Sequence, residues 1–415
     1  MRRPPVHEHR LANGLRVLVE PDPTTPMAVV NVLYDVGSRD EHPDHTGFAH
    51  LFEHFMFEGS ANIPEFDAPL QAAGGTSNAF TNPDMTNYYD VLPASNLDTA
   101  LWLEADRMRE LAFSQHELDT QIRVVCEEFK ENYVNPPYGD LWHHVMDLGY
   151  RVHPYRWPTI GRSIDHVEQI TLDETRAFFD RYYHPANAIL SIAGGVDVDH
   201  VLARVEHFFD DLEGRAVPRR DLPQEPADAR GRSHTVHADV PASTIVLSWP
   251  MPARTDAEYP VHDLASDVLA GDESSRLHRR LVKDEGVLTD VNAFVTGAHD
   301  PGLLMVRGWV ADDVDPRHAH ERLLHAIDEM AANGVTEAER TKAVNGARVA
   351  RVQDELDLGS RAFNRAFYEL LGGWEREVEE DAAYARITPD DLDVVLRRLA
   401  RPGSAHTLFY LTEPA

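Results

Sequence analysis

Residues 45–59 read HTGFAHLFEHFMFEG, and they predict a helix from about Thr46 to Phe57. Three polar side chains, His50, Glu53 and His54, stand at positions i, i+3 and i+4 and therefore share one face of that helix. The other positions are mostly apolar, which is typical of a buried helix. Burying three polar groups together costs free energy unless something satisfies them.

A metal ion would satisfy this polar face. Two imidazoles one helical turn apart can both bind one Zn²⁺ ion, with Zn–N distances of about 2.0–2.1 Å. The carboxylate of Glu53 then lies beside the metal, where it can take a proton from a bound water. We predict His50 and His54 as metal ligands and Glu53 as a catalytic base. A buried His–Glu–His cluster held by hydrogen bonds without metal is the alternative.

A catalytic zinc site has three protein ligands and leaves a fourth position for water. A second predicted helix, over Glu117–Tyr133, offers three carboxylates for the third ligand. On this helix Glu127 and Glu131 point roughly 160° away from the centre of the apolar stripe, towards solvent, whereas Glu128 lies roughly 90° away, at the edge of the buried face. We therefore predict Glu128 as the third ligand. Gln121, two turns earlier on the same face, either hydrogen-bonds a ligand or is an ordinary boundary glutamine.

The second half of the chain repeats the plan of the first. A strand over Met27–Val36 precedes the first helix, and a strand over Ser243–Trp249 precedes a helix over Tyr259–Leu269. The second of these helices has no histidine pair. Between the halves, residues 214–232 contain prolines and charges without periodicity, which indicates a linker.

We therefore expect an α+β fold of two similar domains, each a mostly antiparallel sheet flanked by helices. The length of 415 residues exceeds what one hydrophobic core usually holds. The expected boundaries are 1–213 for a catalytic zinc-binding domain, 214–232 for the linker, and 233–415 for a second homologous domain without a metal site.

Composition excludes several classes of function. The formal net charge of −31 repels nucleic acid phosphates, so no nucleic-acid partner is expected. Cys126 is the only cysteine, which excludes an internal disulfide and a cysteine-based zinc site. No apolar run approaches the roughly 20 residues that span a bilayer. The N-terminus has no apolar segment of a secretory signal, although a removed signal would leave no trace. We expect a bacterial protein of the cytoplasm or periplasm.

Several stretches together resemble the pitrilysin/insulinase family of zinc peptidases, in which H-x-x-E-H is an inverted zinc motif. The H-x-x-E-H motif is followed at a suitable distance by Val-Val-Cys-Glu-Glu, ending at Glu128. The likeness covers the whole chain. Its other segments are GTSNAFTNPDMTNYY (75–89), HPYRWPTIG (153–161), YHPANAILSIAGG (183–195) and DESSRL (272–277).

The resemblance implies one Zn²⁺ per chain, held by His50, His54 and Glu128, with Glu53 as base. It also implies that a peptide substrate is added as a β-strand along residues 78–81, a mode of binding in which main-chain pairing supplies affinity. These substrate-binding residues are Asn78, Ala79, Phe80 and Thr81. The family often has a glutamate where this chain has Gln121.

A further departure concerns an Arg and a Tyr, seven residues apart, with which the family contacts substrate. In the matching stretch LVKDEGVLTD (281–290), Val282 and Thr289 stand at those positions. The family builds a clamshell chamber from four such domains, so a chain of two is half of one. The resemblance therefore implies the zinc-bearing half of a heterodimer with an Arg/Tyr-bearing homologous subunit, or a homodimer.

The expected function is a zinc metalloendopeptidase subunit that hydrolyses peptides or unfolded segments. One alternative is a non-catalytic structural or assembly subunit of the same family. The other is a metal-binding module without hydrolysis.

Overall fold

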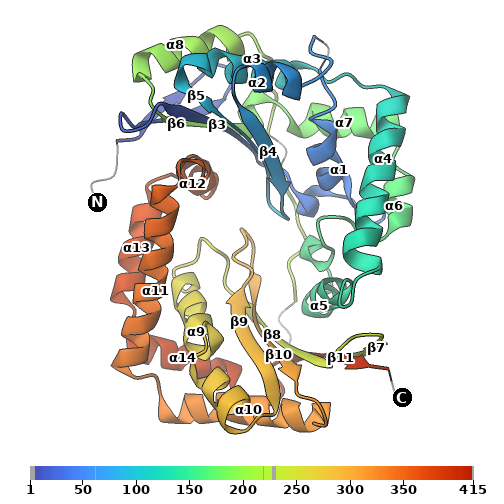
Figure 1. Cartoon of the computed structure of the whole chain (residues 1–415), viewed down its shortest axis with the longest axis vertical. Coiled ribbons are helices and arrows are strands. Elements are labelled where there is room, and N and C mark those ends of the chain that lie inside the picture. Colours follow the sequence, from blue (N-terminus) through green and yellow to red (C-terminus); the bar gives the residue numbers. More distant parts are fainter. Residues whose placement is uncertain (1–4, 61, 218, 227–229, 414–415) are drawn as a thin grey trace. The chain divides into compact units, whose positions relative to one another are not determined.

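A computed structural model of the chain describes residues 5–60, 62–217, 219–226 and 230–413 (Figure 1). The chain forms two compact units, each assembled from separate stretches of sequence. The first unit comprises Met1–Lys130, Trp157–Leu222 and Val352–Glu377, and the second comprises Glu131–Arg156, Pro223–Arg351 and Val378–Ala415.

The first unit is built around a six-stranded sheet with the strand order β1-β2-β6-β3-β5-β4. The strands are β1 (His7–Arg10), β2 (Arg16–Pro21), β3 (Met27–Tyr34), β4 (Thr76–Thr81), β5 (Thr86–Pro93) and β6 (Ala188–Gly194). Neighbouring strands are antiparallel except β2 and β6, which run parallel. The central strands β3 and β6 are almost wholly buried, which explains their continuous apolar sequence. Strand β4 forms an edge of the sheet.

The second unit has a five-stranded sheet with the order β7-β11-β8-β10-β9. Its strands are β7 (Ser233–Ala238), β8 (Thr244–Met251), β9 (Leu288–Val295), β10 (Gly302–Val310) and β11 (His406–Thr412). From β2 onward the two sheets match: β2, β6, β3, β5 and β4 correspond in order to β7, β11, β8, β10 and β9, and in each sheet only the first pair is parallel. The predicted α+β repeat with mostly antiparallel sheets is confirmed.

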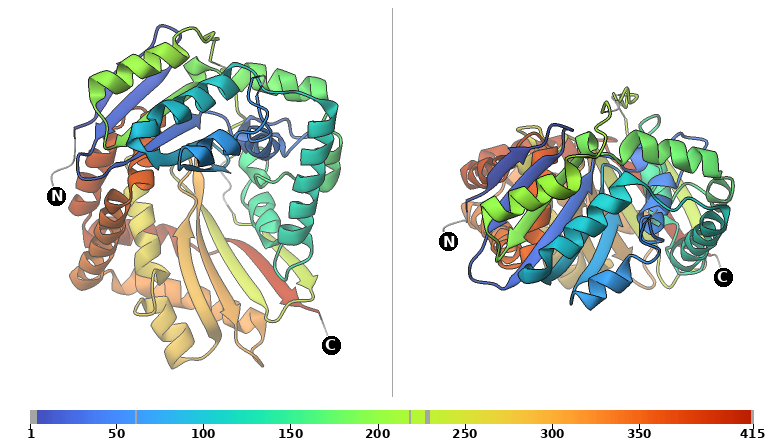
Figure 2. Two further views of the ribbon diagram at one scale, coloured as in Figure 1. Left: turned by 45° about the horizontal axis from the view of Figure 1, so that its top comes forward. Right: turned by 90° about the horizontal axis from the view of Figure 1, so that it is seen from above.

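Helices cover both sheets. Those in the first unit are α1 (Phe48–Phe55), α2 (Asp67–Ala72), α3 (Leu97–Arg109), α4 (Gln115–Phe129), α6 (Ile164–Glu168), α7 (Leu172–Tyr182), α8 (Val198–Phe209) and α12 (Leu358–Leu370). Seen from above in Figure 2, the teal α3 and the yellow-green α8 lie across the blue strands. The other helices are α5 (Leu141–Gly149), α9 (Tyr259–Ala270), α10 (Pro316–Asn333), α11 (Glu337–Leu356), α13 (Arg376–Arg386) and α14 (Pro389–Leu399).

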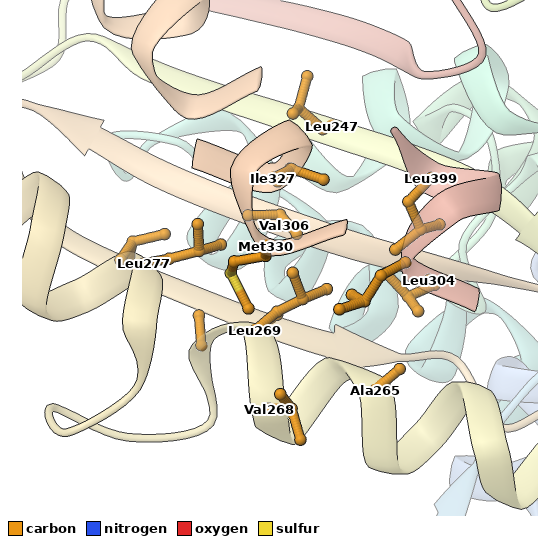
Figure 3. Packing of buried hydrophobic residues seen from close by; sticks show 14 of the residues in the cluster. Leu247, Ala265, Val268, Leu269, Leu277, Leu304, Val306, Ile327, Met330 and Leu399 are labelled. Carbon is orange, nitrogen blue, oxygen red and sulfur yellow. The ribbon is translucent and has the colours of Figure 1, made fainter. Parts of the chain in front are cut away.

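The core of the second unit lies where α9, α10 and α14 pack on its sheet. Figure 3 shows the apolar side chains that meet there, among them Leu247, Leu304 and Val306 from the strands and Ile327 from α10. No helix in the described residues has the length and apolar character needed to cross a bilayer.

Each unit completes its core with a helix from a distant part of the sequence. Helix α12 packs on β2, β3 and β6 of the first unit, and α5 packs on β8 and β11 of the second. The units therefore differ from the contiguous division 1–213, 214–232 and 233–415. Residues 131–156 from the N-terminal half belong to the second unit, and residues 352–377 from the C-terminal half belong to the first. The physical reason is that a sheet with two apolar faces must cover both, and the second face of each sheet is covered by the exchanged helix.

Buried ion pairs hold α12 on the first sheet. Arg365, which is only 2% exposed, donates from Nε to Oε2 of Glu20 on β2 at 2.7 Å and also pairs with the buried Glu377. One turn earlier, Arg361 lies 3.1 Å from Oε1 of Glu20 and donates to Asp22 at 2.7 Å. Removing one partner of such a network leaves buried charges uncompensated.

We predict that Arg365→Leu lowers the free energy of unfolding by about 3–5 kcal/mol, because Glu20 and Glu377 lose their shared cation. The control is Arg397→Leu, which removes a cation that is 58% exposed and lies 4.0 Å from the carboxylate of Asp393. This variant should change the free energy of unfolding by less than about 0.5 kcal/mol. Urea unfolding of both variants measures the difference, and equal losses would contradict the role assigned to the buried network.

Candidate metal site

A buried carboxylate fixes the start of α1. Glu41 accepts hydrogen bonds from the backbone N–H groups of Gly47 at 3.0 Å and Ala49 at 2.9 Å. The indole Nε1–H of Trp157 donates to the same carboxylate at 3.1 Å. Gly47 has a left-handed φ of +99°, and a Cβ there would meet Cγ2 of Val167 at 2.9 Å. Capping by Glu41 and the tight fit at Gly47 therefore set where the helix begins.

Aromatic packing fixes the rotation of α1. Phe52 stacks on Tyr183 with ring centroids 5.0 Å apart, and Phe55 stacks on Phe113 at 5.6 Å. The hydroxyl of Tyr88 donates to the carbonyl oxygen of Phe52 at 3.2 Å. Close packing on these sides leaves one direction for the polar face of the helix.

The polar face of α1 meets α4 at three candidate ligand side chains. The Nε2 atoms of His50 and His54 lie 3.6 and 3.3 Å from Oε2 of Glu128. The candidate ligand atoms of all three residues lie within 4.8 Å of one another. Their side chains are 12%, 26% and 33% exposed, so solvent and a substrate can reach the cluster.

These residues fit a zinc ion. A tetrahedral ion with bonds of about 2.1 Å keeps its ligand atoms about 3.4 Å apart. The observed separations of 3.6 and 3.3 Å are close to that spacing. Two imidazoles with one carboxylate form a donor set that suits Zn²⁺. Within the part of the chain that the structure describes, this is the only such group of His, Cys, Asp or Glu side chains.

The local electrostatics suit both metal binding and proton transfer. Burial lowers the pKa of His50 to about 4, and the carboxylate of Glu128 opposes the shift only in part. A neutral imidazole offers its lone pair to a metal. Burial raises the pKa of Glu53, and the charge of His54 opposes this shift only in part. A carboxylate with increased proton affinity is a better base.

The other glutamates of this region lie away from the cluster. Glu127 is exposed and accepts a hydrogen bond from Lys130 at 2.7 Å. Glu131 is exposed in η3 (Lys130–Val134), a π-helical turn that continues α4. Gln121 is buried, and its Nε2 donates to Glu58 rather than to one of the three candidate ligands.

The four residues of the expected substrate strand form the end of β4. Asn78 and Phe80 are exposed, whereas Ala79 and Thr81 are half-buried on the opposite face. Among the described residues β4 pairs as a strand only with β5, so its other side is an edge of the sheet. Within this stretch the N–H of Ala79 donates to Oδ1 of Asn78 at 2.8 Å. Strand β4 packs against α1, and its last residue, Thr81, lies near Glu53.

Two residues that support the site, Glu41 and Trp157, were not identified from the sequence. Glu41 precedes α1 by several residues, outside any helical period, and Trp157 is distant in sequence. The spacing of Glu41 before a glycine at the helix start could have suggested a capping carboxylate. Trp157 lies in HPYRWPTIG, but nothing in that segment indicates the contact with Glu41.

Comparison with known proteins assigns the family. The model described as "Insulinase (Peptidase family M16)" matches residues 16–162, and "Peptidase M16 inactive domain" matches 169–347. A protein of Helicobacter pylori named "Zinc protease PqqE" is 30% identical over 346 residues, which are 81% of this chain and 78% of that protein. This chain belongs to the M16 peptidase family. Its four candidate site residues all fall within the first match.

Solved structures agree with the fold of the M16 family. A protease from Helicobacter pylori superposes with a TM-score of 0.93 at 25% identity, covering 99% of this chain and 100% of that one. The periplasmic protease PqqL from Escherichia coli gives a TM-score of 0.80 at 19% identity. That match covers 98% of this chain but 47% of PqqL, so this M16 chain has about the extent of one half of PqqL.

We predict that Glu128→Gln weakens zinc binding by more than about 100-fold, beyond the usual effect of losing an outer hydrogen-bond partner of a ligand. Glu127→Gln, which changes the neighbouring exposed carboxylate, should bind about one zinc per chain, as the unmodified protein should. Titration calorimetry on metal-free protein checks this, and full binding by Glu128→Gln would assign the third ligand elsewhere.

Proposed function

We propose that this chain is a zinc-dependent endopeptidase subunit that hydrolyses peptides or unfolded segments. The observation that carries the proposal is the approach of His50, His54 and Glu128 to within 4.8 Å, with Glu53 on the same helix. The name of the Helicobacter relative, a zinc protease, supports the same activity.

The site residues have different proposed roles. His50, His54 and Glu128 would hold the zinc ion. When bound, zinc lowers the pKa of a water ligand towards about 7 and polarises a carbonyl group. Glu53 takes the proton of the attacking water and passes it to the leaving amine. Thr81, at the end of β4, lies beside the Glu53 carboxylate.

The open edge of β4 would bind the peptide main chain. A substrate segment added to this edge as a strand gains backbone hydrogen bonds along Asn78–Thr81. Because Thr81 also lies near Glu53, a peptide paired there lies beside the base. Such pairing requires an extended segment, which selects peptides and unfolded chains over folded proteins.

We further propose that this chain is the zinc-bearing half of a heterodimer. Val282 packs partly buried against the core of the second unit, and Thr289 is exposed on β9. Neither side chain can supply the cation or the phenol that the expected Arg and Tyr would offer to a substrate. The extent of this chain, about half of PqqL, supports the same proposal.

We predict that Glu53→Gln keeps its zinc and lowers kcat by about 10²–10⁴-fold, because the amide cannot accept the proton of water. Glu127→Gln should retain the activity of the unmodified protein. The kcat of both variants is measured either with the chain alone or with its partner, depending on which of the two cleaves peptides. Unchanged turnover in Glu53→Gln would disprove the base assignment.

We predict that the purified chain alone cleaves a quenched fluorescent peptide library poorly, and that an Arg/Tyr-bearing M16 partner restores cleavage that a chelator abolishes. Chelator-sensitive cleavage by the chain alone would mean that it completes its own site, as a homodimer does. No cleavage in any combination would favour the alternative, a non-catalytic structural or assembly subunit.

A further inference from the structure

One arginine of the second sheet is half-buried without an anionic partner. Arg307 lies on β10, and its Nε is buried with no hydrogen-bond partner. Within the part of the chain that the structure describes, its guanidinium forms no ion pair. Burial lowers the pKa of Arg307, and the charge of Asp290 opposes this shift only in part. A cation removed from water without a partner costs free energy, so this arrangement calls for an explanation.

Two aromatic rings hold the guanidinium of Arg307 in place. Its Cζ lies 4.2 Å from the ring centroid of Trp309 and 6.0 Å from that of Phe294. Arg307 and Trp309 are two residues apart on β10, so their side chains project from the same face of the sheet. Stacking occupies the flat face of a guanidinium and leaves the N–H groups at its edge for another partner.

The side-chain amide of Asn292 lies next to Arg307. The two residues are direct partners in the register of β9 and β10, a position in which Cβ atoms are about 4.5–5.5 Å apart. Oδ1 of Asn292 is buried and accepts no hydrogen bond within the described protein. Asp290, two residues earlier on the same face, is 56% exposed and lies 3.8 Å from Nε2 of His278. A cation and an amide oxygen thus lie side by side, each with unused hydrogen-bonding capacity.

This part of the sheet lies beyond the cover provided by α5. Helix α5 packs on β8 and β11, and the buried Met305 of β10 belongs to the same apolar cluster. Arg307 and Trp309 continue along that face outside the cluster, and both are half-buried. Strand β9, which carries Asn292, is an edge of the second sheet (Figure 1). The three side chains therefore retain surface that a ligand can contact.

We propose that Arg307 and Asn292 bind the C-terminal residue of a peptide. Such a residue has a carboxylate and an N–H group on the same Cα. The carboxylate matches the guanidinium, which can donate two parallel hydrogen bonds to it, and the N–H matches Oδ1 of Asn292. The carboxylate of an Asp or Glu side chain has no N–H group on the carbon that bears it. The site lies wholly in the second unit, goes beyond the proposed hydrolysis and needs no zinc ion.

The test measures peptide binding by the full chain. Zinc-loaded Glu53→Gln protein is titrated with a labelled Gly/Ser-rich peptide in three forms: the free acid, the C-terminal amide, and the amide with one internal Glu. We expect the free acid to bind roughly tenfold more tightly than either amide, as a charge-assisted hydrogen-bonded pair implies. The preference should persist after a chelator removes the zinc, because neither proposed residue is a metal ligand.

Substitutions then assign the preference to the site. Arg307→Met should abolish the preference for the free acid, and Arg307→Lys should keep only part of it, because an ammonium group lacks the paired donors. Arg307→Glu should make the amide bind more tightly than the acid, a reversal that misfolding cannot produce. Asn292→Leu should weaken binding of the free acid roughly threefold. The control Arg317→Met removes an exposed arginine of α10 and should leave the preference unchanged.

Four results would overturn the site. The first two are equal binding of acid and amide by the starting protein, and a preference that survives in Arg307→Met. The third is a preference that disappears with the zinc, because the carboxylate would then lie on the metal. The fourth is an internal Glu that binds as tightly as a free C-terminus. Cleavage plays no part in these titrations, so failure of the proposed hydrolysis would leave the site standing.

Discussion

The structure of the first unit depends on the burial of α1, a helix that is apolar on most of its surface but carries three polar side chains on one face. Such a helix can be accommodated only if aromatic partners surround the apolar sides and a polar partner meets the remaining one. Phe113 and Tyr183 supply the former, and Glu128 on α4 supplies the latter. The cap from Glu41 then sets the position of the helix along its axis. The same constraints that bury α1 also bring its histidines to Glu128.

Comparison of the two units shows that the fold can form without the cluster of His50, His54 and Glu128. Their sheets share strand order and orientation, and α9 follows β8 as α1 follows β3. In α9, however, His262 is the only histidine, and its Nδ1 lies 2.9 Å from the carbonyl oxygen of Glu258. A buried imidazole satisfied by the backbone of its own helix needs no metal. One α+β plan therefore supports a candidate metal site in one unit and ordinary packing in the other.

The local pattern of apolar and polar residues predicted a helix or strand well wherever that element alone determines which of its side chains are exposed to solvent. The helix predicted over Tyr259–Leu269 is α9 (Tyr259–Ala270), and the angular position of Glu128 relative to Glu127 agrees with their observed exposure. What local pattern could not predict are pairings between distant segments. Periodicity shows that a helix has an apolar face, but not which sheet that face covers. The exchange of α5 and α12, the contact of Trp157 with Glu41, and the approach of Phe363 to Phe80 are all of this kind.

The exchanged helices have a consequence for how the protein is made. A ribosome releases the chain from the N-terminus, so the six strands of the first sheet emerge long before residues 358–370. Until α12 arrives, the face formed by Leu18, Leu33 and Ile189 remains uncovered. The N-terminal half is therefore an aggregation-prone nascent chain during most of its synthesis. A gene cut between the halves would yield two fragments that each lack a helix of their core, so the boundary suggested by the linker is not one at which this protein can be divided.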